Sequence, residues 1–217
     1  MELYKLGSRG EMVRQIQKAL AGAGLGVIPD GIFGNITRDA IIAFQREHNL
    51  TADGIVGPAT LALLIPQRLK KSRRTIKEII VHCTATPEGR NMTVEQIRAD
   101  HKKKGWSDIG YHYVIDTQGK RFTGRDVDLI GAHCAAGGHN TYSIGVAYVG
   151  GLENKPNTPY SQLKAKDTRN LRQRAALLKL LTELKVLYPQ AIIVGHHDYD
   201  KGKDCPSFDA KTEYKNI

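Results

Sequence analysis

The sequence predicts an α/β domain, with a mixed and mostly parallel sheet flanked by helices, preceded by a small all-α domain of three helices. Over residues 78–217, short apolar runs of strand length alternate with longer stretches of helical periodicity, a pattern typical of α/β folds. Over residues 1–66, apolar residues recur at helical spacing between turn-forming Asp-Gly pairs. The 217 residues, of which 41% are hydrophobic, suffice for a core in each part.

The small domain is expected to begin with a helix capped by Ser8. Ser8 and Glu11 have the spacing of a capping box, in which the first residue caps the helix and the fourth reaches back to it. Apolar side chains then follow at helical intervals until a glycine-rich stretch ends the helix. These residues are Val13, Ile16, Ala19 and Leu20, followed by Gly22, Gly24 and Gly26.

A phrase that occurs twice predicts the other two helices of this domain. Asp-Gly-Ile-Phe-Gly-Asn-Ile-Thr at 30–37 returns as Asp-Gly-Ile-Val-Gly-Pro-Ala-Thr at 53–60. Each copy joins a turn to a helix start, and Pro58 suits the first turn of a helix. The helix between the two phrases is expected to bury a stripe formed by Ala40, Ile41 and Phe44, with Ile36 as a further candidate.

Basic charge is concentrated between the two domains. Residues 67–77 hold six basic and no acidic side chains, whereas residues 1–66 hold six of each and residues 78–217 hold twenty basic and sixteen acidic ones. The segment 67–77 therefore supplies more than half of the net charge of +10, and we interpret it as a linker. Two explanations of its charge stay open: steering towards an anionic surface, or solvation of a flexible connection.

The second domain is expected to alternate strands and helices. Residues 79–84 predict a central strand, and residues 93–104 an amphipathic helix that Thr93 caps and Gly105 ends. The order continues with a hairpin over 111–116 and 120–123, a strand over 143–149, a helix over 171–187 and a last strand over 191–194. The long helix is expected to place Leu177, Leu178, Leu181 and Leu184 on its apolar side.

Cysteine usage and hydropathy bear on where the chain is made. Three widely spaced cysteines do not predict a disulfide framework, and we expect Cys134 to be a free thiol. No apolar run approaches the ~20 residues of a membrane span, and the start of the chain carries no apolar secretion signal. We therefore expect a chain that is made in a reducing cytoplasm and has no membrane span; we also expect a monomer.

Histidine and cysteine at the ends of two predicted strands indicate a zinc site. His82 lies at the polar end of the first strand, while His196 and His197 follow the last strand, whose loop runs on to Cys205. Imidazole and thiolate suit zinc, and three protein ligands leave a fourth position for water, as in catalytic sites. Because side chains alternate along a strand, Cys83 is expected to point into the core, and only one of the paired histidines to bind metal. The spacing leaves open which one.

Both parts resemble known proteins of the bacterial cell wall. Residues 5–65 resemble the peptidoglycan-binding domain of cell-wall hydrolases, through the repeated phrases and the segments 40–45 and 60–64. The second domain resembles the zinc-dependent N-acetylmuramoyl-L-alanine amidases of bacteriophage lysozyme type, a superfamily shared with peptidoglycan recognition proteins. The motifs that carry this resemblance are VHCTAT at 81–86, GWSDIGYHY at 105–113, GAH at 131–133, SIGV at 143–146, GG at 150–151, HHD at 196–198 and KDCPSFD at 203–209.

The resemblance implies a function and a set of site residues. It implies an endolysin that hydrolyses the amide bond between N-acetylmuramic acid and L-alanine of peptidoglycan by zinc-activated water, acting on the wall after release from the host cytoplasm. It selects His196 over His197 as a ligand. The implied residues are His82, His196 and Cys205 for zinc, Tyr111 and Lys203 for catalysis, and His133 and Asn140 for substrate binding.

Other interpretations stay open at this point. A member of the superfamily can recognise peptidoglycan without turnover, although such members often lack the cysteine ligand that Cys205 provides here. Some phage relatives also bind a host RNA polymerase. A cysteine hydrolase based on Cys83 is a further alternative. Nucleic-acid binding is not expected, because no aromatic stacking surface or recognition helix accompanies the basic segment.

Overall fold

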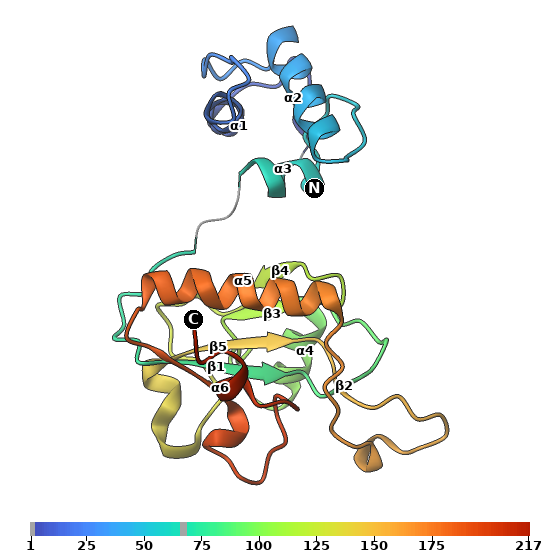
Figure 1. Cartoon of the computed structure of the whole chain (residues 1–217), viewed down its shortest axis with the longest axis vertical. Coiled ribbons are helices and arrows are strands. Elements are labelled where there is room, and N and C mark those ends of the chain that lie inside the picture. Colours follow the sequence, from blue (N-terminus) through green and yellow to red (C-terminus); the bar gives the residue numbers. More distant parts are fainter. Residues whose placement is uncertain (1–2, 66–68) are drawn as a thin grey trace. The chain divides into compact units, whose positions relative to one another are not determined.

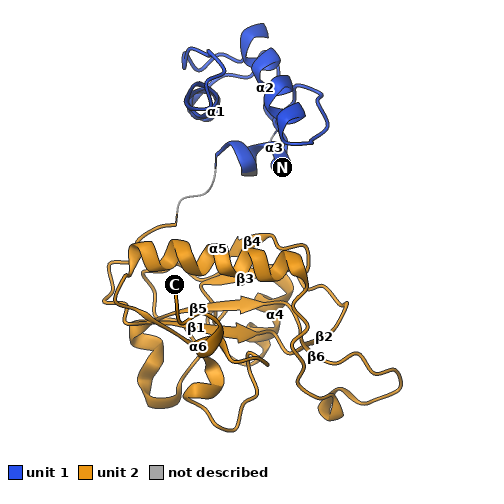
Figure 2. Ribbon diagram, in the orientation of Figure 1, with its two compact units in different colours: residues 1–68 blue, residues 69–217 orange. Residues whose placement is uncertain are grey.

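The computed structural model describes residues 3–65 and 69–217, and these form two compact units with a boundary between residues 68 and 69 (Figure 2). The first unit is built from three helices, and the second from a sheet with helices on its faces (Figure 1). The predicted fold class is confirmed for both. Residues 66–68, which include the start of the predicted linker, lie outside the described residues.

The first unit contains α1 (Glu11–Gly22), α2 (Asn35–Glu47) and α3 (Pro58–Leu64), as the periodicity predicts. Their apolar stripes meet in one core that includes Val13, Ile16, Leu20, Phe33, Ile41 and Phe44. Two predictions were wrong. Ser8 does not cap α1, because its hydroxyl accepts from the Lys5 N–H at 3.0 Å and the helix starts after Gly10. Ile36 is 72% exposed, because it lies in the first turn of α2 on the side away from the core.

Two buried glutamines explain why the repeated phrase forms the same turn twice. The Gln17 amide nitrogen donates to Asp30 Oδ1 at 2.8 Å and to the Ile32 carbonyl at 3.0 Å, while its oxygen accepts from the Gly31 N–H at 2.7 Å. Gln45 repeats this pattern with Asp53, Ile55 and Gly54 at 3.0, 2.9 and 2.9 Å. Each glutamine thus supplies the partner that the buried glycine N–H of the turn would otherwise lack.

Much of the basic segment packs onto the second unit and does not form a free linker. Lys70 pairs with Asp126 at 2.9 Å and with Asp128 at 2.8 Å, and Arg73 pairs with Asp128 at 3.1 Å. Ser72 is buried and donates to the Val127 carbonyl at 2.7 Å. The predicted linker over 67–77 is therefore too long: from residue 69 onward, ion pairs with distant aspartates fix the chain and neutralise part of its charge.

A five-stranded sheet organises the second unit, in the order β4 (Arg121–Thr123), β3 (Tyr113–Ile115), β5 (Ser143–Tyr148), β1 (Glu78–Cys83) and β7 (Ile192–Gly195). All neighbours are parallel except the edge pair β3 and β4, so the prediction of a mixed and mostly parallel sheet is confirmed. A short parallel pair, β2 (Thr86–Pro87) with β6 (Gly151–Leu152), extends beyond the carboxyl ends of β1 and β5.

Helices cover both faces of this sheet. α5 (Leu171–Leu187) packs on the face that carries Ile79 and Val81, together with the short α6 (Ala210–Glu213). α4 (Val94–Lys103) packs on the opposite face, and Thr93 caps it as predicted, in a capping box that it forms with Gln96. The buried leucines of α5 are Leu177, Leu180, Leu181 and Leu184, so the prediction for Leu178 was wrong: it is 48% exposed. No helix of the described residues is long and apolar enough to cross a membrane.

We predict that Gln17→Met loosens the first unit. The substitution keeps the size of the side chain but removes the partners of a buried N–H and carbonyl, which costs about 2 kcal/mol. Amide hydrogen exchange in residues 11–64 of the full chain is expected to accelerate by roughly 30-fold, and exchange in residues 78–217 to stay unchanged. Gln15→Met, on the exposed side of α1, is the matched control. Equal exchange rates in both variants would contradict the role given to Gln17.

Candidate metal centre

The register of two parallel strands brings the predicted histidines together. Val81 of β1 lies beside Gly195 of β7, so the next residues, His82 and His196, leave the same edge of the sheet at the same level. Their rings are 4.7 Å apart between centroids. The chain then turns through 196–198 and returns with Cys205, whose carbonyl accepts from the backbone N–H of His197 at 2.8 Å.

A buried arginine holds the loop that carries Cys205. The side chain of Arg169 is 0% exposed and pairs with Asp167 at 2.9 Å and with Glu213 at 2.8 Å. Its guanidinium lies 3.1 Å from the ring centroid of Phe208, three residues after Cys205. Because a buried arginine is stable only when it is fully paired, this cluster fixes the loop against the core.

The three side chains converge with a geometry that fits zinc. One ligand atom from each of His82, His196 and Cys205 lies within 4.8 Å of the other two, and no other such group occurs within residues 3–65 and 69–217. The distance from Cys205 Sγ to His82 Nδ1 is 3.6 Å. Tetrahedral zinc, with Zn–N near 2.05 Å and Zn–S near 2.3 Å, requires about 3.6 Å between such a nitrogen and sulfur. The donor set and spacing therefore suit zinc.

Burial keeps the two imidazoles in the neutral form that can bind a metal. His82 is 1% exposed, and desolvation, with a smaller contribution from His196, holds its pKa well below the usual range. Desolvation also lowers the pKa of His196; the charge of Asp200 opposes this shift and that of Lys203 adds to it. Both rings therefore keep an unprotonated nitrogen at neutral pH.

The strand neighbour of His82 lies in the core, as predicted. Cys83 is 6% exposed and packs with Val81 and Tyr148 beneath α5. Its backbone N–H donates to Cys205 Sγ at 3.3 Å, an interaction that stabilises negative charge on that sulfur. The proximity of the two thiols lowers the pKa of Cys83 to about 7, whereas the same proximity, together with burial, raises the pKa of Cys205.

Tyr111 and Lys203 lie beside the cluster. The Tyr111 ring centroid is 5.3 Å from that of His82. Burial, with the nearby cysteines, raises the pKa of Tyr111 far above its usual value, so the phenol stays protonated at neutral pH. Lys203 is exposed, and its backbone N–H closes a turn on the Asp200 carbonyl at 3.0 Å, in the loop between His196 and Cys205.

The polar atoms of His133 and Asn140 are engaged inside the protein. His133 is 6% exposed, and its ring nitrogens contact His82 Nε2 at 3.0 Å and Ser143 Oγ at 3.3 Å. Asn140 Oδ1 accepts from the N–H groups of His133 and Cys134 at 2.9 and 2.8 Å, which shapes the loop between them. Both His133 ring nitrogens therefore have partners within the protein.

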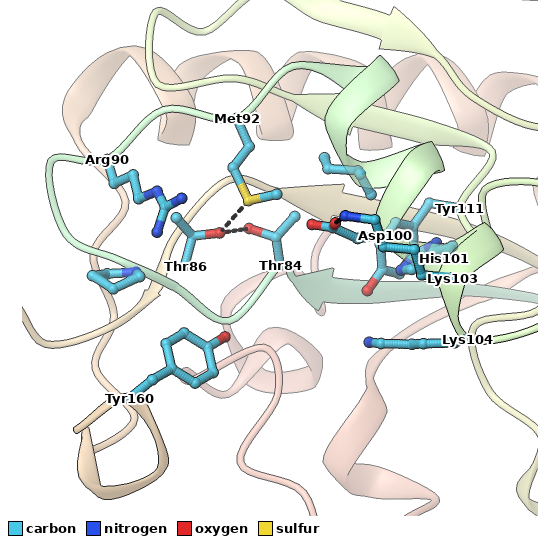
Figure 3. A pocket seen from close by; sticks show the side chains of 12 residues that line it. Thr84, Thr86, Arg90, Met92, Asp100, His101, Lys103, Lys104, Tyr111 and Tyr160 are labelled. Atoms are coloured by element: carbon cyan, nitrogen blue, oxygen red, sulfur yellow. Dashed lines mark hydrogen bonds and ion pairs between the residues drawn. The ribbon is translucent and has the colours of Figure 1, made fainter.

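A pocket of about 430 Å³ opens next to Tyr111 (Figure 3). Its inner wall carries Thr84 and Thr86, whose hydroxyls are 2.8 Å apart, and Met92 Sδ accepts from Thr86 at 3.0 Å. Tyr160 stands on the other side and donates to the Ala85 carbonyl.

The rim of this pocket is mainly basic. Arg90, Lys103 and Lys104 contribute positive charge, and Asp100 is the single acidic side chain among the lining residues. Sequence reasoning missed the pocket, because its walls come from segments far apart in the chain. The feature of the sequence that points to a basic pocket is the lysine run at 102–104, at the end of the amphipathic helix.

Comparisons with known proteins agree with the fold and the site. A family model described as N-acetylmuramoyl-L-alanine amidase matches residues 72–208, and one described as a putative peptidoglycan binding domain matches residues 9–64. An endolysin of Klebsiella phage KP32 is 42% identical over 139 residues, 64% of this chain and 85% of that protein. An endolysin of Escherichia phage T7 is 39% identical over 141 residues, 65% of this chain and 87% of that protein.

A solved structure shows the same architecture. The amidase LysC from Clostridium intestinale is 27% identical, with a TM-score of 0.50 over 64% of this chain and 82% of that one. The fold and these likenesses define the second unit as the catalytic domain of a peptidoglycan hydrolase. The chain belongs to the N-acetylmuramoyl-L-alanine amidase family.

We predict that the purified chain carries about one zinc ion per molecule, held by the three clustered side chains. His82→Ala, His196→Ala and Cys205→Ala are each expected to lose the metal after dialysis, as measured by elemental mass spectrometry. His197→Ala and Cys83→Ala are the controls and are expected to keep it, because neither residue is in the cluster. Zinc retained in the Cys205 variant, or lost from the His197 variant, would contradict the assigned ligand set.

Proposed function

We propose that this protein is an endolysin that cleaves the amide between the lactyl group of N-acetylmuramic acid and L-alanine, in a reaction that depends on zinc. The convergence of His82, His196 and Cys205 beside a basic pocket carries the proposal. Three protein ligands leave the fourth tetrahedral position open, which is the arrangement of catalytic zinc. When bound there, zinc supplies an activated water and polarises the amide carbonyl.

Tyr111 and Lys203 supply the polar chemistry around that centre. Because its pKa is raised, Tyr111 acts as a protonated phenol that orients the attacking water by a hydrogen bond and exchanges a proton with it. Lys203, exposed and close to His196, can place its ammonium against the negative charge that develops on the carbonyl oxygen. Burial of His82 excludes bulk water from one side of the site.

The basic pocket is suited to the stem peptide of the substrate. Peptidoglycan stem peptides carry free carboxylates, whereas the N-acetylated sugars of the glycan are largely neutral. The rim cations Arg90, Lys103 and Lys104 match the peptide, and Thr84 and Thr86 offer hydroxyls to its backbone. We therefore place the peptide in the pocket, with the scissile amide near Tyr111.

The first unit is proposed to hold the enzyme on the wall, since it matches the peptidoglycan-binding model over 56 residues, 9–64. Attachment to an insoluble substrate raises the local concentration of the catalytic domain at its target bonds. We further propose synthesis in the host cytoplasm and action on the wall after release, in keeping with the phage endolysins that the chain resembles.

The bond that is cut tests this function directly. Digestion of purified wall is expected to release new N-terminal alanine without new reducing sugar ends. Treatment with a zinc chelator is expected to abolish this release, and added zinc to restore it. New reducing ends would identify a glycosidase and overturn the proposal.

We predict that Tyr111→Phe and Lys203→Met lower kcat by roughly 10²- to 10³-fold, the range expected for loss of proton transfer or of one oxyanion partner. Bound zinc is expected to remain at wild-type level, because neither residue belongs to the metal cluster. Steady-state kinetics on soluble wall fragments, with metal content measured on the same samples, checks this. Wild-type kcat in either variant would remove that residue from the mechanism.

We predict that Lys104→Glu raises KM for stem-peptide substrates, because it replaces attraction of a carboxylate by repulsion. The effect is expected to be about 10-fold at low salt and to shrink as salt rises, since exposed charges are screened. Lys102→Glu is the matched control, as it makes the same charge change two residues earlier, in the last turn of α4 and outside the pocket lining. An equal rise in KM for both variants would indicate general charge repulsion and not a peptide contact.

A further inference from the structure

A row of buried side chains runs from His82 into the protein. His82, His133 and Ser143 are 1%, 6% and 0% exposed. His82 Nε2 lies 3.0 Å from His133 Nδ1, His133 Nε2 lies 3.3 Å from Ser143 Oγ, and Ser143 Oγ lies 2.7 Å from the His139 carbonyl oxygen. The row therefore ends on a backbone group whose hydrogen-bonding role is fixed.

The carbonyl at the end of the row determines where every proton lies. A carbonyl only accepts, so the Ser143 hydroxyl donates to His139 and its oxygen must accept from His133 Nε2–H. His133 is buried, and its two ring nitrogens face an imidazole and a hydroxyl and not a carboxylate that would pair with a cation, so the ring is neutral and its Nδ1 carries no proton. His133 Nδ1 therefore accepts from His82 Nε2–H, which leaves His82 Nδ1 with its lone pair exposed.

That lone pair is aimed at the metal centre, since His82 Nδ1 lies 3.6 Å from Cys205 Sγ. In the opposite proton arrangement, the Ser143 hydroxyl would donate to His133 Nε2. His133 would then carry its proton on Nδ1 and donate to His82 Nε2, so the proton of His82 would be on Nδ1, facing the metal. Only one of the two proton arrangements is compatible with metal binding by this nitrogen.

The ring of His133 is also held in place by the backbone around it. A Cβ atom at Gly131 or at Gly145 would lie 2.4 Å from His133 Cδ2, closer than any real contact. Two glycines thus leave the space that the ring fills. His112, next in line, uses its own Nδ1 to accept from the Gly145 N–H at 2.9 Å, so it does not compete for the His133 nitrogens.

We propose that Ser143 and His133 are positioning residues that fix the tautomer of His82, so that its Nδ1 lone pair is held ready for the metal. This inference rests on the proposed function, because it concerns one ligand of the proposed zinc site. It gives His133 a role behind the ligand and not against the substrate. Ligand histidines elsewhere usually donate their second N–H to a carboxylate, a carbonyl or water, whereas here a second imidazole, set by a serine, accepts it.

The first experiment compares two serine variants of the full chain. Ser143→Ala removes the acceptor for His133 Nε2–H, and Ser72→Ala removes a buried serine that also donates to a carbonyl at 2.7 Å but lies outside the row. Zinc affinity, measured by competition with a chelator, is expected to fall 10- to 100-fold in Ser143→Ala and to stay within about 2-fold in Ser72→Ala. Equal zinc affinity in wild type and Ser143→Ala would overturn the proposal.

The second experiment replaces His133 in two ways. In His133→Asn, the side-chain oxygen can stand where Nδ1 stood and still accept from His82, whereas His133→Leu offers no acceptor. Zinc affinity is expected to be largely kept by asparagine and lost by leucine. An equal loss in both variants would indicate that the ring is needed for packing alone and would contradict the proposal.

Nitrogen-15 spectra of the histidine rings test the tautomers without reference to activity. In metal-free wild type, His133 is expected to carry its proton on Nε2, and Ser143→Ala is expected to populate the Nδ1 form. A proton on His133 Nδ1 in the wild-type protein would overturn the inference. If wild type binds no zinc at all, the proposed function fails, while these spectra still decide the tautomer of His133.

Discussion

The parallel pairing of β1 with β7 is the constraint on which the rest of the catalytic unit depends. It sets His82 and His196 at one level of one sheet edge, although they lie 114 positions apart in the chain (196 minus 82). A shift of one residue in either strand would turn one imidazole to the other face of the sheet and separate the pair. The apolar residues that fix the register, such as Ile80 and Val194, are therefore as necessary to the site as the ligands.

Hydrogen bonds hold in place the side chains that strand pairing brings together. Two side chains of the cluster have a partner that limits their motion or protonation: His133 lies behind His82, and the backbone N–H of Cys83 lies beside Cys205. Arg169 also holds the loop that bears the thiol. Burial of polar side chains costs free energy unless each polar atom forms a hydrogen bond. The described residues contain no buried side-chain nitrogen or oxygen without a partner. A satisfied network of this kind preorganises the site for its ligand.

The sequence was sufficient for the architecture and for the residues at strand ends, because both follow from local rules. Alternation along β1 placed Cys83 in the core, and Thr93 was recognisable as a cap from its neighbours alone. The failures share a different cause. The Ser8 hydroxyl accepts a hydrogen bond in a turn with Lys5 and does not cap the helix. In α5, leucines stand both inside and outside the buried face, so the helical period did not distinguish Leu178, which is exposed, from Leu180, which is buried. Contacts between distant segments, such as Lys70 with Asp128, or His133 with Ser143, leave no local signature.

The central claim is that two imidazoles and one thiolate hold a single metal ion. X-ray absorption at the zinc edge of the purified protein measures this most directly. The account predicts a mixed shell with nitrogen or oxygen scatterers near 2.0–2.1 Å and one sulfur near 2.3 Å. A shell without sulfur in the wild-type protein would contradict it.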